Sequence, residues 1–122
     1  MGKKTVLIVE DEVRNQKLFR DVLEKVGYKT IIAVNGEEGV QLALKEQPGL
    51  ILMDMQMPVK DGLEATQEIK ANPLTTKIPV VALTALAMRG DEDRIRDAGC
   101  DDYISKPVQI RALIDKVGSY FQ

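Results

Sequence analysis

Short apolar runs alternate along the chain with segments in which apolar residues recur at helical spacing, and the runs predict β-strands. The expected strands are Thr5–Glu10, Lys29–Ala33, Leu50–Asp54, Val80–Thr84 and Asp102–Ile104. The runs Val6–Val9 and Leu50–Met53 are apolar at every position, as are strands of a parallel sheet that helices cover on both faces. The second run is short and the fifth is more polar, so we expect these two at the edges of the sheet.

Five segments between and after these runs carry apolar residues at helical spacing. The first has one apolar stripe and ends before Gly27, a helix-terminating residue. The second begins at Asn35 with Glu38 three residues further on, an arrangement typical of a capping box. The third and fourth are expected at about Asp61–Ala71 and Met88–Ala98. The positions expected to face the core are Leu18, Phe19, Val22, Leu23 and Val26 in the first helix, Val40, Ala43 and Leu44 in the second, and Ile110, Leu113, Ile114, Val117 and Phe121 in the fifth.

The strict alternation of strands and helices predicts an α/β fold with a doubly wound, five-stranded parallel sheet and helices on both faces. The most common strand order for such a sheet is 2-1-3-4-5. The 122 residues fit one domain that spans the whole chain, 1–122. In sheets of this kind ligands bind beyond the carboxyl ends of the strands, where the first and third strands part.

Composition narrows the possible functions. The formal net charge is −2, and no cluster of lysine and arginine is long enough to follow a phosphate backbone, which argues against nucleic-acid binding. No apolar run approaches the roughly 20 residues of a membrane span. The N-terminal residues lead directly into the first strand, without a signal peptide. We therefore expect a cytoplasmic protein with no nucleic-acid or membrane partner.

The chain has no histidine and one cysteine, Cys100. The absence of histidine excludes histidine-based catalysis within this chain and most transition-metal sites. A single cysteine excludes an internal disulfide and lacks the spacing of a zinc site. Cys100 is therefore expected to be a small buried side chain.

Polar side chains stand where four of the five expected strands end. Glu10 and Asp11 follow the first strand, and Asp54 ends the third. Thr84 ends the fourth strand, and Lys106 follows the fifth. Because the carboxyl ends of parallel strands meet at one edge of a sheet, we expect these side chains to lie together. Three carboxylates, a hydroxyl and an ammonium would form a site for a divalent cation and a phosphoryl group.

Neighbouring carboxylates repel one another unless some are protonated or a cation lies between them. A set of oxygen ligands alone favours Mg²⁺ over zinc. We expect Asp11 and Asp54 to bind the ion directly, Glu10 to bind it through water, and the backbone carbonyl of Gln56 to point inward. The alternative for Glu10 to Glu12 is a solvated loop that leads into a helix.

Asp54 is also a candidate nucleophile, because a carboxylate can accept a phosphoryl group as an aspartyl phosphate. Such a transfer depends chiefly on alignment and on neutralisation of oxygen charge, which Thr84, Lys106 and a metal ion provide. A cis Lys106–Pro107 bond would aim the lysine across the strand ends. Simpler interpretations are that Asp54 and Thr84 cap the following elements, and that Lys106 is an exposed lysine before a helix.

Taken together, these residues resemble the receiver domain of two-component response regulators over essentially the whole chain. The similarity lies in the stretches LIVEDE, LILMDMQMP, VVALTALAM and YISKP. The matching positions are the metal-binding acidic pair Glu10-Asp11, the phosphoacceptor Asp54, the turn Asp61-Gly62, the hydroxyl Thr84, the switch aromatic Tyr103 and the Lys106-Pro107 motif. The resemblance implies a flavodoxin-like receiver domain, which we expect to lack an output domain.

By this resemblance, a histidine kinase or a histidine phosphotransfer protein donates a phosphoryl group from phosphohistidine to Asp54 when Mg²⁺ is bound. Thr84 then moves inward and Tyr103 turns into the vacated space. This changes the face formed by the fourth helix, fifth strand and fifth helix, where a downstream protein target would bind. We expect the chain to catalyse only its own phosphorylation and dephosphorylation, and so not to be an enzyme. The alternative for Tyr103 is an edge-strand aromatic packed on a helix.

Two further positions are expected, by the same resemblance, to set the lifetime of the aspartyl phosphate. Gln56 lies two residues after the acceptor, and Leu86 lies two residues after Thr84. An apolar Leu86 over the phosphoryl group would hinder attack by water, while Gln56 would orient it. We therefore expect a lifetime of minutes rather than seconds.

Three other functional classes have to be weighed against a phosphoacceptor. An aspartate-nucleophile phosphohydrolase usually has a second Asp two residues after the nucleophile, where this chain has Gln56, and a cap domain. A receiver-like protein that binds partners without phosphorylation would not need the intact acidic, hydroxyl and lysine positions. A nucleotide- or flavin-binding module would need a glycine-rich phosphate loop after the first strand, and the sequence has none there.

Overall fold

The fold is a single five-stranded parallel sheet, seen in a computed structural model that describes residues 4–57, 59–85 and 91–121. The strands are β1 (Thr5–Val9), β2 (Lys29–Ala33), β3 (Leu50–Asp54), β4 (Val80–Thr84) and β5 (Asp102–Ser105). Their order is β2-β1-β3-β4-β5, so the expected fold class, strand order and edge strands are confirmed. Compared with the sequence-based ranges, β1 ends one residue earlier and β5 extends one residue further.

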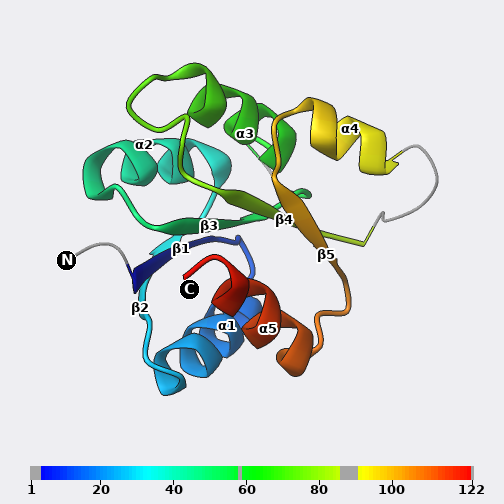
Figure 1. The fold of residues 1–122 in the computed structure, drawn as a ribbon. Helices are drawn as coiled ribbons and strands as arrows, with labels where there is room; N and C mark the ends of the chain where they lie inside the picture. Colours follow the sequence, from blue (N-terminus) through cyan, green and yellow to red (C-terminus); the bar gives the residue numbers. More distant parts are fainter. Residues whose placement is uncertain (1–3, 58, 86–90, 122) are drawn as a thin grey trace.

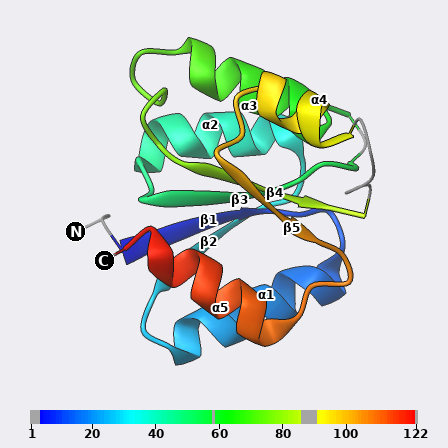
Figure 2. The same ribbon diagram turned by 45° about the vertical axis from the view of Figure 1, so that its right-hand side comes forward.

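Helices cover both faces of this sheet, as the apolar strands require (Figure 1). The helices are α1 (Val13–Lys25), α2 (Gly36–Glu46), α3 (Gly62–Ala71), α4 (Asp91–Asp97) and α5 (Ile110–Ser119). Figures 1 and 2 show α1 and α5 on one face and α2, α3 and α4 on the other. The expected start of the fourth helix at Met88 lies outside the described residues. No helix in the described ranges is long and apolar enough to cross a membrane.

The core forms two layers, one on each side of the sheet. In β1, Leu7 and Val9 belong to the layer beneath α2, α3 and α4, while Val6 and Ile8 belong to the layer with α1 and α5. Every residue of β1, β3 and β4 is buried. Alternating polar side chains along these strands would be buried without hydrogen-bond partners. The strands are therefore formed by continuous apolar runs. Cys100 is buried and unpaired, as expected.

Four residues expected in the core are largely exposed, so those assignments are wrong. Leu18, Val26, Leu44 and Ile110 are 39%, 46%, 41% and 50% exposed. The buried stripes of α1 and α5 are narrower than expected and consist of Phe19 and Leu23, and of Leu113 and Val117. In α2 the buried residues are Gly36, Gly39 and Ala43. A Cβ atom at Gly39 would lie 2.9 Å from the Val9 side chain, so α2 approaches the sheet through small residues that hydrophobicity does not reveal.

Candidate functional site

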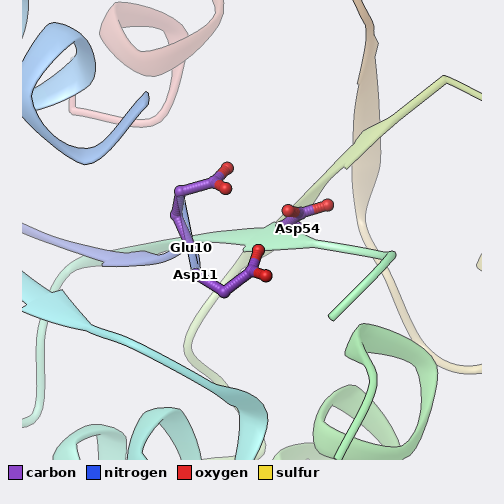
Figure 3. Close-up of side chains that lie close together, drawn as sticks. All are labelled: Glu10, Asp11 and Asp54. Carbon is purple, nitrogen blue, oxygen red and sulfur yellow. The ribbon is translucent and has the colours of Figure 1, made fainter. Parts of the chain in front are cut away.

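The three predicted carboxylates meet at the carboxyl ends of β1 and β3 (Figure 3). Each of Glu10, Asp11 and Asp54 offers an oxygen atom, and these atoms lie within 4.8 Å of one another. The two strands are neighbours with Val9 opposite Met53, which brings the residues that follow them side by side. Glu10 and Asp54 are 1% and 2% exposed, whereas Asp11 is exposed. The carboxyl ends of these strands therefore bring acidic oxygen atoms together in a partly buried cluster.

Glu10 is a buried carboxylate whose two oxygen atoms have different surroundings. Its Oε2 atom accepts a hydrogen bond from the Glu12 backbone N–H at 3.1 Å. Its Oε1 atom, in contrast, is buried and has no hydrogen-bond partner among the residues that the structure describes. Burial, which is the largest cause, and the nearby charge of Asp54 together raise the pKa of Glu10 to about 7. A cation next to Oε1 would remove this unfavourable arrangement.

Asp54 is held by a lysine that follows the edge strand β5, two strands away from β3 in the sheet. Its Oδ1 atom accepts hydrogen bonds from Lys106 Nζ at 3.0 Å and from the Gln56 backbone N–H at 3.0 Å. The Lys106 backbone N–H donates to the Thr84 carbonyl at 2.8 Å, which fixes the lysine at the end of β5. The Lys106–Pro107 peptide bond is cis, as the sequence suggested. Lys106 thus compensates the charge of the buried carboxylate.

Thr84 ends β4 beside these groups and is 1% exposed. Together with Gln56 it lines a hollow whose other wall is formed by Arg94 and Ile95 of α4. Thr84 therefore stands between the acidic site and α4. The second predicted lifetime position, Leu86, lies outside the described residues.

Tyr103 lies on the edge strand β5, half buried against the core layer beneath α4. Its phenol O–H donates a hydrogen bond to Glu92 Oε2 at 2.6 Å, across to α4. This hydrogen bond is the main reason why the pKa of Tyr103 is raised. The aromatic ring thus links β5 to α4.

Comparisons with known proteins settle the family. Residues 6–118 match the response regulator receiver domain. The chain belongs to this family. It is 50% identical over 117 residues to the polar-differentiation response regulator DivK of Brucella anthropi, covering 96% of this chain and 95% of that protein. The resemblance inferred from the motifs is confirmed, and the protein carries a receiver domain of two-component signalling.

Solved structures agree with this assignment. The receiver domain of the sensor histidine kinase PA1611 from Pseudomonas aeruginosa is 34% identical and superimposes with a TM-score of 0.90, covering 97% of both chains. That structure has a magnesium ion coordinated in its active site cleft. The chemotaxis protein CheY4 of Vibrio cholerae has a TM-score of 0.90 at 22% identity, covering 95% of this chain and 97% of that one, and supports the fold.

The acidic cluster of this receiver domain suits a magnesium ion. Its donors are oxygen atoms only, from Glu10, Asp11 and Asp54, and Mg²⁺ prefers such ligands. The Oε1 atom of Glu10, buried and without a partner in the described part of the chain, is an acceptor that a cation or its bound water would satisfy. Gln56 lines the same depression over the carboxylates, which keeps its backbone carbonyl a candidate ligand.

Some residues around the receiver site were not assigned a role from the sequence. Glu92 accepts a hydrogen bond from Tyr103. Lys60, after the acceptor strand, forms ion pairs with Glu37 and Glu68. These residues are polar positions in exposed loops and helices, so no periodicity or motif singles them out. Only the tertiary contacts identify them.

Proposed function

We propose that this receiver domain is a phosphoacceptor switch of a two-component or phosphorelay system, in which Asp54 receives a phosphoryl group with Mg²⁺ bound. One observation carries the proposal. The Asp54 carboxylate is 2% exposed, accepts a hydrogen bond from Lys106 Nζ at 3.0 Å, and lies in one cluster with Glu10 and Asp11. A nucleophilic oxygen, a cation and a cation site are the parts that phosphoryl transfer needs.

In the proposed transfer, an oxygen of Asp54 attacks the phosphorus of a partner's phosphohistidine. The phosphorus–nitrogen bond breaks, its electron pair stays on the imidazole nitrogen, and an acyl phosphate forms on Asp54. Glu10, Asp11, Asp54 and the Gln56 carbonyl would hold Mg²⁺, which when bound neutralises charge on the phosphoryl oxygens. The Lys106 ammonium and the Thr84 hydroxyl would donate hydrogen bonds to the same oxygens.

The new charge at Asp54 would then change the conformation of residues outside the acidic cluster. Thr84 would move toward the phosphoryl group, and Tyr103 would exchange its hydrogen bond to Glu92 for a more buried position. The proposed output surface is the face formed by α4, β5 and α5. Gln56 and Leu86 would set the lifetime of the phosphorylated form, in the range of minutes.

The proposed partners are a histidine kinase or histidine phosphotransfer protein as donor and a downstream protein as target, and the proposed location is the cytoplasm. The chain would catalyse only its own phosphorylation and dephosphorylation. No feature of the described residues favours turnover of small phosphoesters, and the residue two after the acceptor is Gln56 rather than an acid.

The test is incubation with acetyl phosphate and Mg²⁺, followed by the mass of the intact protein. The expected result is one base-labile phosphoryl group, absent with EDTA and absent in Asp54→Asn. Asp21→Asn is the matched control, because Asp21 is an exposed aspartate on α1 paired with Lys17. Repeated hydrolysis of the donor without an adduct would instead indicate an enzyme. An adduct that persists in Asp54→Asn would refute the assigned acceptor.

A further inference from the structure

The loop between β3 and α3 joins the acceptor to a lysine that the proposed chemistry does not use. Its described residues are 55–57 and 59–61; they include Gln56 and end at Asp61, the residue that caps α3. Lys60 is the residue before that cap. Because Gln56 binds Asp54 through its backbone N–H, the conformation of this loop determines the geometry on one side of the acceptor.

The side chain of Lys60 ties the loop to two helices. Its ammonium pairs with Glu37 Oε1 of α2 at 3.0 Å and with Glu68 Oε2 of α3. The lysine side chain is only 17% exposed, although both carboxylates are about half exposed. A partly buried lysine that bridges two helices is a fixed point, because it gives up two charge-assisted hydrogen bonds if the loop moves.

The backbone of Lys60 is fixed as well. A Cβ atom at Gly36, the first residue of α2, would lie 2.2 Å from the Lys60 carbonyl oxygen. Directly after the loop, a Cβ atom at Gly62, the first residue of α3, would lie 2.3 Å from the carbonyl oxygen of Asp54, which precedes the loop. Glycine is therefore required at both places, and the loop is seated on α2 at one point and on the acceptor strand at the other.

The backbone of Val59, the residue before Lys60, has a conformation that its surroundings impose. Val59 has a φ of +71° and is 85% exposed. A β-branched residue rarely adopts this left-handed conformation, and the exposed side chain gains no packing from it. Such a conformation persists only when its surroundings fix it. The described residue next to Val59 is Lys60, which is anchored by its ion pairs and by the close approach of its carbonyl to Gly36.

We propose that Lys60 is a positioning residue for the phosphoacceptor site: its ammonium, anchored on Glu37 and Glu68, and its carbonyl, seated on Gly36, hold the β3–α3 loop so that Gln56 stays beside Asp54. The inference rests on the proposed function, because Gln56 matters there as a metal ligand. It adds the N-terminal turn of α2, which contributes no atom to the acidic cluster, to the elements that set metal affinity.

The test is calorimetric titration of the metal-free protein with Mg²⁺. Gly36→Ala should weaken Mg²⁺ binding on the order of 10-fold, the usual effect of disturbing an outer partner of a metal ligand. Lys60→Gln should weaken it by up to about fivefold, since ion pairs with half-exposed carboxylates are modest. The double variant Glu37→Gln/Glu68→Gln should match Lys60→Gln, and adding it to Lys60→Gln should cause no further loss.

Two variants are matched controls. Gly118→Ala also changes a helical glycine, but its Cβ would meet only the Tyr28 hydroxyl, at 3.8 Å. Lys17→Gln removes a lysine whose ion pair with Asp21 lies on the exposed surface of α1. Both should bind Mg²⁺ as the wild type does. Lys60→Arg, which keeps the two ion pairs, should restore most of the affinity lost in Lys60→Gln.

The melting temperature without metal separates positioning from simple stabilisation. A merely structural Lys60 would lower the melting temperature while the folded protein kept its Mg²⁺ affinity, and this result would overturn the inference. If Gly36→Ala does not fold, the comparison of Lys60→Gln with Lys60→Arg decides. The proposed function fails separately, when the wild type itself takes up no phosphoryl group at Asp54.

Discussion

At the scale of single residues, Glu10 shows how a functional site opposes stability. The side chain is 1% exposed, and one of its oxygens has no hydrogen-bond partner among the described residues. Burial and, second, the charge of Asp54 raise its pKa from 4.5 to about 7. The folded protein therefore binds this proton more tightly than the unfolded chain does. The sequence places the acid at the end of a buried strand, and the strand has to bury it.

The first prediction concerns the pH dependence of the metal-free protein. Because the pKa of Glu10 is raised in the folded state, ionised Glu10 destabilises the folded protein. This destabilisation is absent at low pH, grows as the pH rises above about 4.5, and is complete above about 7. Glu10→Gln removes it. In EDTA, the stability of Glu10→Gln relative to wild type should rise by roughly 2–3 kcal/mol between pH 5 and pH 8. Urea unfolding at both pH values measures this, and parallel curves for the two proteins would contradict it.

A second prediction concerns the hydrogen bond from Tyr103 to Glu92, at 2.6 Å. If phosphorylation draws Tyr103 away from Glu92, this bond opposes the phosphorylated state. Tyr103→Phe and Glu92→Gln should each increase the steady-state phosphorylated fraction. The equilibrium constant between the unphosphorylated and phosphorylated forms should rise by about 2- to 10-fold. The double variant should add little to either single variant.

Phosphate-affinity electrophoresis after acetyl phosphate treatment measures that fraction. Asp93→Asn is the control, because Asp93 lies next to Glu92 on α4 and pairs with Arg96 instead. Lower phosphorylation in both Tyr103→Phe and Glu92→Gln would show that the hydrogen bond favours the active state, contrary to this prediction.

At the scale of elements, α2 is positioned by small residues rather than by a large apolar face. Its buried residues are Gly36, Gly39 and Ala43, and Leu44, the most hydrophobic candidate for the core, is 41% exposed. Close contact with β1 therefore depends on the missing side chain at Gly39. The same closeness brings Gly36 against the loop that follows the acceptor.

The third prediction tests this packing. In Gly39→Ala the new methyl group would lie 2.9 Å and 3.0 Å from the two γ carbons of Val9, so α2 or the strand has to move. The variant should lose about 1–3 kcal/mol of unfolding free energy. Gly118→Ala, whose Cβ would meet only the Tyr28 hydroxyl at 3.8 Å, should be neutral or gain up to about 1 kcal/mol from helix propensity. Urea unfolding of both variants checks the difference, and an unchanged Gly39→Ala would show that α2 adjusts freely.

At the scale of the whole molecule, the sequence pattern predicts which site residues meet but not which polar side chains pair with them. Continuous apolar runs identified the strands, and strand order then brought Glu10, Asp11 and Asp54 together. The partners Glu92 for Tyr103 and Glu37 for Lys60 could not be predicted. Each joins polar surface positions of separate elements, and hydrophobic periodicity carries no signal for such pairs.

The last prediction concerns the effect of metal binding at the acidic cluster on the stability of the whole molecule. A ligand that binds only the folded state stabilises it by about 2.7 kcal/mol at 100 times its dissociation constant. For a chain of 122 residues this raises the melting temperature by roughly 10 °C. Because Glu10 has to lose its proton to face a cation, the increase should be larger at pH 8 than at pH 6.

Differential scanning calorimetry with Mg²⁺ or with EDTA at equal ionic strength measures both effects. Asp11→Asn should lose most of the increase at either pH, since Asp11 is the exposed member of the acidic cluster and its removal leaves the core intact. Glu10→Gln should keep part of the increase but lose its pH dependence. An equal increase in Asp11→Asn and wild type would place the ion elsewhere. The acidic cluster would then destabilise the fold, and no metal ion would compensate its charge.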